Sequence, residues 1–207
     1  MFLKVFSCGP IQTNAILIGC LEKKVCAVID PACDSAKQVV QEAREKGFKI
    51  EKILLTHSHW DHIADVASLY QETQAPVYVH PEDAPNVLAP GSDGLPLFFQ
   101  IQGVKSVESL QDEQILTVGG LSFRVIHSPG HTPGGVCFYL EKQGVLISGD
   151  TLFKGAYGRV DLPTGDLKRM QKTLALLKTL PPDTRVIPGH GPETTIAKEL
   201  RSHSWDL

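Results

Sequence analysis

Residues 56–62 read Thr-His-Ser-His-Trp-Asp-His and constrain the fold more than any other stretch of the chain. They follow directly on the apolar run 53–55, which is typical of the buried end of a strand, so we expect the histidines on the loop after it. In an extended loop His57 and His59 can point the same way, whereas the adjacent Asp61 and His62 must diverge. We therefore expect one pair to serve one metal ion and the other pair to serve a second ion close by.

The composition bounds the class of protein. With 207 residues, 42% of them hydrophobic and 21% charged, the chain can bury a full core, and we expect one domain over 1–207. A formal net charge of -3 without a basic cluster argues against nucleic acid as a partner. No apolar run approaches the ~20 residues of a membrane helix, so we expect no membrane association.

Five cysteines, an odd number without a CxxC pair, argue for a reducing compartment, and we expect a cytoplasmic protein. The cysteines are expected to be small buried side chains. The oligomeric state does not follow from the sequence.

Strand and helix patterns alternate along most of the chain. Strands are expected at 2–6, 13–19, 24–29, 53–55, 77–79, 114–118, 123–127, 136–140, 145–148 and 185–187, with the first three antiparallel. Helices are expected at 35–46, 61–73 and 166–179 and near the end of the chain. Residues 81–106 are rich in Pro and Gly, so little regular structure is expected beyond a helical turn at 82–88. This segment is either a lid over the metals or a packed surface loop.

Three further strand ends carry a metal-ligand type behind a turn residue: His131 after Pro-Gly, Asp150 after Gly149, and His190 after Pro-Gly. In sheets flanked by helices the strand ends meet at one edge, and glycine there permits close backbone approach. The candidate ligands, which together offer imidazoles and carboxylates, are His57, His59, Asp61, His62, His131, Asp150 and His190. Such a set suits zinc, iron or manganese better than magnesium or calcium.

The competing interpretation is that these are unrelated polar loop residues, since a single histidine is more often structural than ligating. The repetition of the pattern at four strand ends favours the metal site. For the remaining histidines the structural role is preferred. His80 and His127 are expected to support the site or merely to end strands, and His203 lies in a polar tail.

The order His-x-His-x-Asp-His, a later His, an Asp after Gly and a final Gly-His resembles the metallo-β-lactamase superfamily over nearly the whole chain. The resemblance implies an α/β protein, a four-layer αβ/βα sandwich with two mixed β-sheets face to face and helices outside. It implies that His57, His59 and His131 hold the first metal, that Asp61, His62 and His190 hold the second, and that Asp150 bridges both. Zinc β-lactamases mostly carry Cys in the bridging position, so Asp150 argues against antibiotic hydrolysis.

Within this superfamily, Gly149-Asp150-Thr151-Leu152-Phe153, the Gly-Arg-Val-Asp at 158–161 and the Pro-Thr-Gly at 163–165 resemble glyoxalase II (hydroxyacylglutathione hydrolase) and its short single-domain relatives. The larger enzymes carry a C-terminal helical domain that helps to hold glutathione, and a Tyr two residues after the final His. This chain ends soon after His190 and has Pro192 at that position, so we expect no such domain.

The resemblance implies a metal-dependent hydrolase that cleaves a small acyl thioester, such as a hydroxyacylglutathione, with a hydroxide bridging two divalent ions. Zinc is favoured, with iron, manganese or a mixture as alternatives. Metal ions lower the pKa of bound water from about 15.7 to about 7. Asp61 and Asp150 are the expected catalytic residues, Asp61 by aiming the hydroxide. Lys154, Tyr157 and Arg159 are candidate substrate contacts, and Arg159 pairs either with a substrate carboxylate or with Asp161.

The main rival is an oxidoreductase. Glutathione persulfide dioxygenases resemble the chain in the Gly-Arg-x-Asp loop and hold one iron with two His and one Asp, whereas residues 150–153 and Pro163 favour the hydrolase. Ribonuclease-like phosphodiesterases use similar ligands, but the acidic balance and the lack of an RNA-gripping arm disfavour them. The intact ligand set disfavours a non-catalytic metal-binding role.

Overall fold

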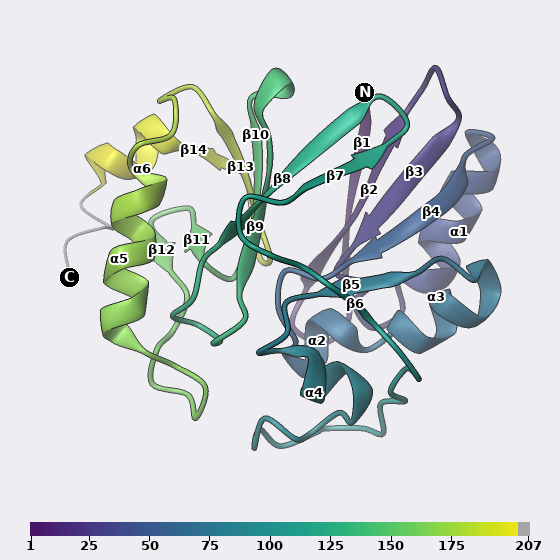
Figure 1. Ribbon diagram of the computed structural model, residues 1–207, viewed down its shortest axis with the longest axis horizontal. Helices are drawn as coiled ribbons and strands as arrows, with labels where there is room; N and C mark the ends of the chain where they lie inside the picture. The colour runs from purple at the N-terminus through teal and green to yellow at the C-terminus, as the bar shows by residue number, and fades with distance from the viewer. Residues whose placement is uncertain (203–207) are drawn as a thin grey trace.

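The computed structural model describes residues 1–202 and contains two six-stranded sheets with helices outside them (Figure 1). The first sheet has the order β1 (Phe2–Cys8), β2 (Thr13–Cys20), β3 (Val25–Ile29), β4 (Lys49–Leu54), β5 (Val77–Val79) and β6 (Glu108–Ser109). The second has the order β14 (Thr194–Thr195), β13 (Arg185–Pro188), β10 (Val145–Gly149), β9 (Val136–Leu140), β8 (Leu121–His127) and β7 (Ile115–Val118). A separate small hairpin pairs β11 (Leu152–Phe153) with β12 (Ala156–Tyr157).

Both sheets are mixed, as predicted. In the first, β1 to β3 are antiparallel and β3 to β6 run parallel. In the second, β10 and β13 are parallel and the other pairs are antiparallel.

The sheets pack face to face. Strand β2 is buried at every position, and its side chains alternate between two cores because successive residues of a strand point to opposite faces. Ile16 and Ile18 lie in the core between the sheets, together with Phe123 and Phe138 of the second sheet. Leu17 lies in the core on the helix side. The predicted four-layer sandwich is confirmed.

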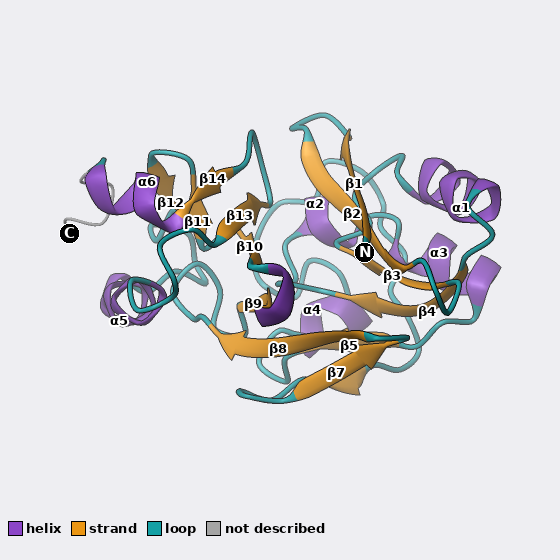
Figure 2. Ribbon diagram, turned by 90° about the horizontal axis from the view of Figure 1, so that it is seen from above, coloured by secondary structure: helices purple, strands orange, loops and turns teal. Residues whose placement is uncertain are grey.

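Helices cover both outer faces (Figure 2). On the first sheet these are α1 (Ala36–Glu45), α2 (Trp60–Ile63), α3 (Val66–Thr73) and α4 (Ala84–Leu88), and on the second α5 (Leu167–Leu177) and α6 (Ile196–Arg201), with a 3-10 turn, η1 (Glu141–Gln143), between β9 and β10. Helix α5 buries Met170, Leu174 and Leu177, and the Asp166 side chain caps its start by accepting from the Arg169 N–H at 3.0 Å.

The single helix predicted over 61–73 is wrong, because the chain forms α2 and α3 with a break at Asp65. The Asp65 N–H donates to the Pro31 carbonyl, and its carboxylate accepts from the Ala36 N–H at the start of α1. These contacts with a neighbouring segment replace the hydrogen bonds that a continuous helix would need.

Two strand predictions also need correction. Strand β4 begins at Lys49, four residues before the expected 53–55, because its first half is only partly buried and the apolar run marks its interior end. The two-residue strands β6, β11, β12 and β14 were not predicted, since strands this short carry too little periodicity. Within 81–106 the one regular element is α4, as predicted. His203 lies outside the described residues.

Among residues 1–202, no helix combines the length and the apolar character that crossing a membrane requires.

Candidate metal centre

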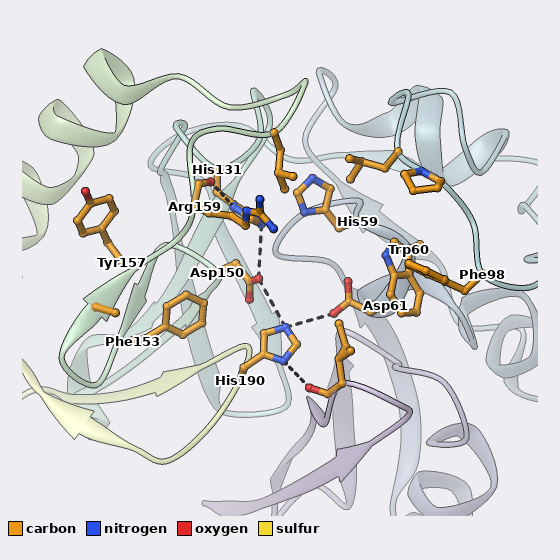
Figure 3. A pocket seen from close by; sticks show the side chains of 15 residues that line it. His59, Trp60, Asp61, Phe98, His131, Asp150, Phe153, Tyr157, Arg159 and His190 are labelled. Atoms are coloured by element: carbon orange, nitrogen blue, oxygen red, sulfur yellow. Dashed lines mark hydrogen bonds and ion pairs between the residues drawn. The ribbon is translucent and has the colours of Figure 1, made fainter.

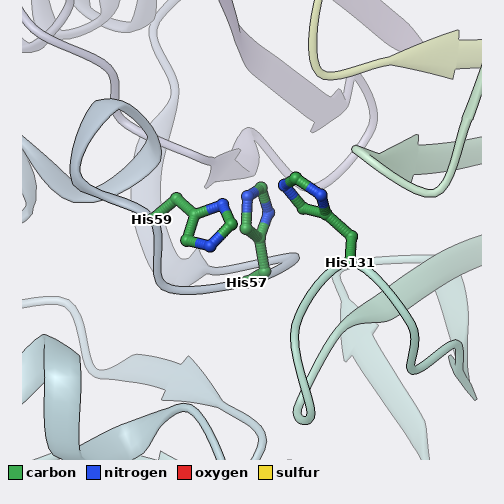
Figure 4. Close-up of side chains that lie close together, drawn as sticks. All are labelled: His57, His59 and His131. Carbon is green, nitrogen blue, oxygen red and sulfur yellow. The ribbon is translucent and has the colours of Figure 1, made fainter. Parts of the chain in front are cut away.

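All the candidate ligands lie at one edge of the two sheets. The loop after β4 carries His57 and His59, and helix α2, which follows it, carries Asp61 and His62. The loops after β8, β10 and β13 carry His131, Asp150 and His190. Figure 4 shows the rings of His57, His59 and His131 turned toward one another, although His131 comes from the other sheet. Every ligand predicted from the sequence is therefore brought into one site.

The ligand atoms form two groups. His57, His59 and His131 make one group and Asp61, His62 and His190 the other, and within each group the atoms that could bind a metal lie within 4.8 Å of one another. These are the two sets that the family resemblance implies.

Asp150 stands between the two groups (Figure 3). One of its carboxylate oxygens lies 3.4 Å from Nε2 of His131 and 3.5 Å from Nε2 of His190. The other oxygen lies 3.3 Å from Nε2 of His62. Asp61 stays within the second group, 3.2 Å from both His62 and His190. Of the two candidate carboxylate ligands, Asp150 is thus the one placed to serve both groups.

Backbone carbonyls orient two of the imidazoles. Nδ1 of His131 lies 2.8 Å from the carbonyl oxygen of Arg159, and Nδ1 of His190 lies 3.1 Å from that of Ile11. A carbonyl oxygen can only accept, so Nδ1 carries the proton in both rings. Nε2 of each ring is left facing the site.

Asp30, just after β3 of the first sheet, orients two more rings, that of His62 directly and that of His57 through Thr56. It accepts from Nδ1 of His62 at 3.0 Å and from the Thr56 hydroxyl at 2.6 Å. Because the Thr56 hydroxyl donates its proton to Asp30, it must accept a hydrogen bond from Nδ1 of His57, which lies 3.1 Å away. His57 and His62 therefore also present Nε2.

His59 is turned the other way. Its Nε2 lies 3.1 Å from the hydroxyl of Thr164, which itself donates to the carbonyl of His131. The hydroxyl therefore accepts from Nε2 of His59, and the lone pair on Nδ1 is free. Such partners behind metal-binding histidines hold the ring and its tautomer in place.

Several of these atoms are buried without a well-oriented hydrogen bond. Nε2 of His57, His62 and His131 and one oxygen of Asp150 form no well-oriented hydrogen bond, although all but His57 lie in the imidazole–carboxylate ion pairs described above. A buried polar group left unsatisfied costs about 1–3 kcal/mol, so several in one place are uncommon in a folded protein. Two divalent cations, one in each group, would satisfy them. The nitrogen and carboxylate donors thus fit a resident zinc, iron or manganese ion.

The histidines of the site have pKa values shifted in opposite directions. Burial, together with the neighbouring His62, lowers the pKa of His57 well below its usual range, and burial lowers that of His59 to about 3. Burial alone would lower the pKa of His190, but its hydrogen bonds to Asp150 and Asp61 raise it to about 9.

The carboxylates are held ionised. Burial alone would raise the pKa of Asp61 and Asp150, but the charge of His62 and the hydrogen bonds from His190 and His62 keep both below their usual range. In turn, although burial opposes it, the acidic neighbours raise the pKa of His62. Without a metal, protonated His62 and His190 balance the two carboxylates.

Two supporting acids escaped the sequence analysis. Asp30 follows directly on β3, so the strand-end signal that identified the ligands would also have found it. Asp83 precedes α4 in the Pro-rich segment and left no such signal. It accepts from the Ser58 N–H at 2.9 Å, the Thr132 hydroxyl at 2.9 Å and the Gly134 N–H at 2.7 Å. Asp83 therefore ties the first ligand loop to the loop that carries His131.

The N-terminal hairpin supports the second group. The hydroxyl of Thr13 donates to Asp61 at 2.7 Å. The side-chain amide of Asn14 donates to the carbonyls of Pro188 at 2.9 Å and Gly191 at 3.0 Å, on either side of His190. Neither residue could be recognised from the sequence, because the partners are remote along the chain.

A cavity of about 680 Å³ opens over the candidate ligands (Figure 3). Its floor includes His59, Asp61, His131, Asp150 and His190. Its walls are largely apolar and consist of Ile11, Trp60, Leu95, Pro96, Phe98, Phe153, Ala156, Tyr157, Arg159 and Leu162.

Two of the three candidate substrate contacts line this cavity, namely Tyr157 and Arg159, whereas Lys154 is exposed and is not part of its lining. Arg159 makes the local pair that the sequence left open. Its Nε and Nη2 donate to the two carboxylate oxygens of Asp161 at 2.9 and 2.8 Å.

Part of the segment 81–106 borders the cavity. Leu95, Pro96 and Phe98 form one wall, and Trp60 packs against Phe98 with ring centroids 5.2 Å apart. The segment therefore lies beside the cavity, which a lid over the metals would require.

His80 and His127 lie apart from the candidate ligands. Their rings stack with centroids 4.2 Å apart. Nδ1 of His80 accepts from the Glu82 N–H at 3.3 Å, and Nε2 of His127 donates to the Pro133 carbonyl at 3.0 Å. Both rings are thus engaged in local hydrogen bonds, as the structural interpretation expects.

Known proteins resemble the chain in sequence. The profile of the metallo-beta-lactamase superfamily matches residues 8–190. The "Probable metallo-hydrolase YqgX" of Bacillus subtilis is 34% identical, over 92% of this chain and 90% of that protein. The "Hydroxyacylglutathione hydrolase GloC" of Haemophilus influenzae is 31% identical, over 99% of this chain and 98% of that protein.

Solved structures resemble it in fold. The crystal structure of BLEG-1 B3 metallo-beta-lactamase superimposes with a TM-score of 0.87 at 36% identity and covers 97% of each chain. TTHA1623, crystallised in a di-iron-bound form, gives 0.83 at 38% identity, over 96% of this chain and 98% of the other. ETHE1 from Myxococcus xanthus gives 0.81 at 26% identity, over 98% of this chain and 83% of the other.

Proposed function

Because the chain belongs to the metallo-β-lactamase superfamily, we propose that it is a dinuclear metallohydrolase that cleaves small acyl thioesters. The observation that carries this proposal is the position of Asp150 between two three-residue groups of candidate ligands. A single ion would leave one of these groups unused, with buried atoms that lack a well-oriented hydrogen bond.

His57, His59 and His131 would hold one ion, and Asp61, His62 and His190 would hold the other, with Asp150 serving both. Divalent ions at such a site acidify water, so that a nucleophile exists at neutral pH, and polarise the carbonyl of the substrate. Zinc suits the imidazole and carboxylate donors, and the di-iron form of TTHA1623 makes iron the first alternative.

The side chains position the reactants. Thr13 donates to one oxygen of Asp61, which limits how that carboxylate can turn. Asp61 is thereby placed to accept a hydrogen bond from the attacking water and to aim it. The apolar walls of the cavity exclude bulk water, which strengthens every charge interaction within it.

The lack of a proton donor among the carboxylates of the site supports a thioester substrate. Asp61 and Asp150 are held ionised, so neither can donate a proton to a leaving group. A departing thiolate needs no such proton near neutral pH, since a thiol pKa is only about 8.5. An amine or alkoxide would need one. The similarity to GloC points to the same class of substrate.

The test uses protein stripped of metal with a chelator, checked for folding by circular dichroism, and reloaded with zinc, iron or manganese. Thiol release from S-lactoylglutathione and from simpler thioesters is measured, together with bound metal. We expect hydrolysis by the reloaded protein alone, with about two ions per chain. Normal hydrolysis by the metal-free protein would refute the proposal.

Asp150→Ala tests the bridging position. We expect fewer than two ions per chain and a loss of more than about 100-fold in kcat, because even the partners behind ligands are worth 10- to 100-fold. The control is Asp183→Asn, which removes a negative charge from an exposed turn. Both metals and full turnover in Asp150→Ala would show that Asp150 does not bridge.

The second candidate is a mononuclear-iron persulfide dioxygenase, the class that the chain resembles in its Gly-Arg-Val-Asp loop at 158–161. Oxygen uptake with glutathione persulfide, together with one iron per chain, would favour it. A cephalosporin belongs in the same panel because BLEG-1, named as a B3 metallo-beta-lactamase, is 36% identical to this chain.

We propose small molecules as the partners of the site, rather than nucleic acid or a membrane, because the net charge is -3 and the cavity is largely apolar. The cytoplasm is the proposed location, which the five free cysteines support.

A further inference from the structure

We propose that the cavity selects thioesters whose thiol portion is uncharged, and that Asp161 helps to set this preference by pairing with Arg159. The inference rests on the proposed thioesterase function and adds the class of thiol carrier. It runs against glutathione, which carries carboxylates and an ammonium group.

The first support is the wall opposite the ligands. Phe98 is 73% exposed at the cavity, although large apolar side chains are usually covered. Trp60 packs against its ring and holds it there. Phe153 and Leu162 continue the apolar lining. Such a surface gains by covering an apolar group and offers nothing to a charged one.

The second support is the charge of the lining. Among the described residues that line the cavity, Arg159 is the only charged one that is not a candidate metal ligand. Both its Nε and its Nη2 donate to Asp161. The pair is therefore neutral overall, so a substrate carboxylate that binds the remaining N–H groups of Arg159 meets no net positive charge.

The third support is that Arg159 is fixed beside the site by its backbone. Its carbonyl accepts from Nδ1 of His131 at 2.8 Å. The preceding Gly158 lets the loop pack against the backbone of Asp150, because a Cβ there would overlap the carbonyl oxygen of Asp150. The side chains of Arg159 and Asp161 are 63% and 68% exposed, so their ion pair contributes little to stability. The ion pair instead neutralises the positive charge of Arg159 at the cavity.

The experiment compares two thioesters with the same acyl group, S-hexanoylglutathione and the hexanoyl thioester of N-acetylcysteamine, on the metal-loaded protein. We expect kcat/KM to be roughly tenfold higher for the uncharged compound, a typical discrimination for one well-defined difference in a pocket. A glutathione thioester hydrolysed equally well or better would overturn this inference and leave the thioesterase proposal standing. Hydrolysis of neither would overturn the proposed function, and this inference with it.

Asp161→Asn tests the role of the acid. We expect the ratio of the two kcat/KM values to move toward the glutathione thioester by about threefold to fivefold, the size of one exposed ion pair, chiefly through KM. Asp183→Asn, which changes the net charge equally, should leave the ratio unchanged. A ratio that does not move in Asp161→Asn would overturn the assignment to Asp161.

Discussion

Asp30 accepts the Nδ1 proton of His62 at 3.0 Å, although 32 residues separate them. The same carboxylate accepts from the N–H of Thr56 at 2.7 Å and from its hydroxyl at 2.6 Å. One acid at the end of β3 therefore fixes the ring of a candidate ligand and the backbone where the ligand loop begins. It reaches both groups of ligands, since Thr56 in turn orients His57.

Asp30→Asn should weaken metal binding by about 10- to 100-fold, the usual cost of losing a partner behind a metal-binding histidine. The amide cannot accept at both of its side-chain atoms, so one of the donors from His62 and Thr56 meets an NH2 group. Competition with a chromophoric chelator measures the affinity. Asp34→Asn is the control, because Asp34 is exposed. Wild-type affinity in Asp30→Asn would show that another contact orients His62.

Gly189→Ala should abolish normal metal loading. A Cβ at this position would lie 2.1 Å from an oxygen of Asp150 and 2.7 Å from Cε1 of His62, so both candidate ligands would have to move. Bound metal per chain, measured after gel filtration, reports the effect.

Gly191→Ala is the matched control. A Cβ there meets nothing within 4 Å, but φ is +71°, so the change should cost only about 1 kcal/mol of unfolding free energy and keep the metal. Equal metal loss in both variants would point to backbone strain rather than to contact with the ligands.

Metal binding should release about three protons per chain at pH 7.5, two from histidines, which must be neutral to bind a metal, and one from the water that the ions acidify. The pKa of His190 is raised to about 9 by Asp150 and Asp61 against the effect of burial, and that of His62 is also raised, so both carry a proton without metal. His57 and His59 are already neutral. Calorimetry in buffers of different ionisation enthalpy counts the protons. Release near zero at pH 7.5 would contradict these protonation states.

The raised pKa of His190 should make the metal-free protein less stable at high pH. Since the pKa of His190 is above its ordinary value of 6.5, its ion pairs stabilise the fold fully below pH 6.5 and lose this effect as the pH rises through about 9. Urea unfolding of the metal-free protein at pH 7 and pH 10 checks the sign. Stability that rose over this range would refute it.

Phe98→Ala should raise KM for hexanoyl thioesters several-fold and leave the unfolding free energy within about 0.5 kcal/mol of the wild type, because an exposed side chain contributes little to the core. Ile115→Ala, at another exposed apolar residue, on β7 and outside the cavity lining, is the control for both measurements. An unchanged KM in Phe98→Ala would remove this residue from the substrate site.

The helix pattern illustrates the limit of local reasoning. Periodicity predicted one helix over 61–73, and of the apolar residues of that pattern Val66 and Leu69 are buried in α3 and Tyr70 is partly buried. The break at Asp65 depends on Pro31 and Ala36, which reach this position only in the folded chain. Arg159 shows a similar limit, because spacing allowed either a substrate or Asp161 as its partner.

The sequence by itself determined which side chains could bind a metal, and that each follows a strand, because ligand chemistry and strand periodicity are properties of short segments. Only the tertiary structure decided which nitrogen of each imidazole faces the site, because Asp30, Thr164 and the carbonyls of Ile11 and Arg159 come from distant parts of the chain. It also decided that Asp150 lies between the two groups, since that position depends on how two sheets pack against each other.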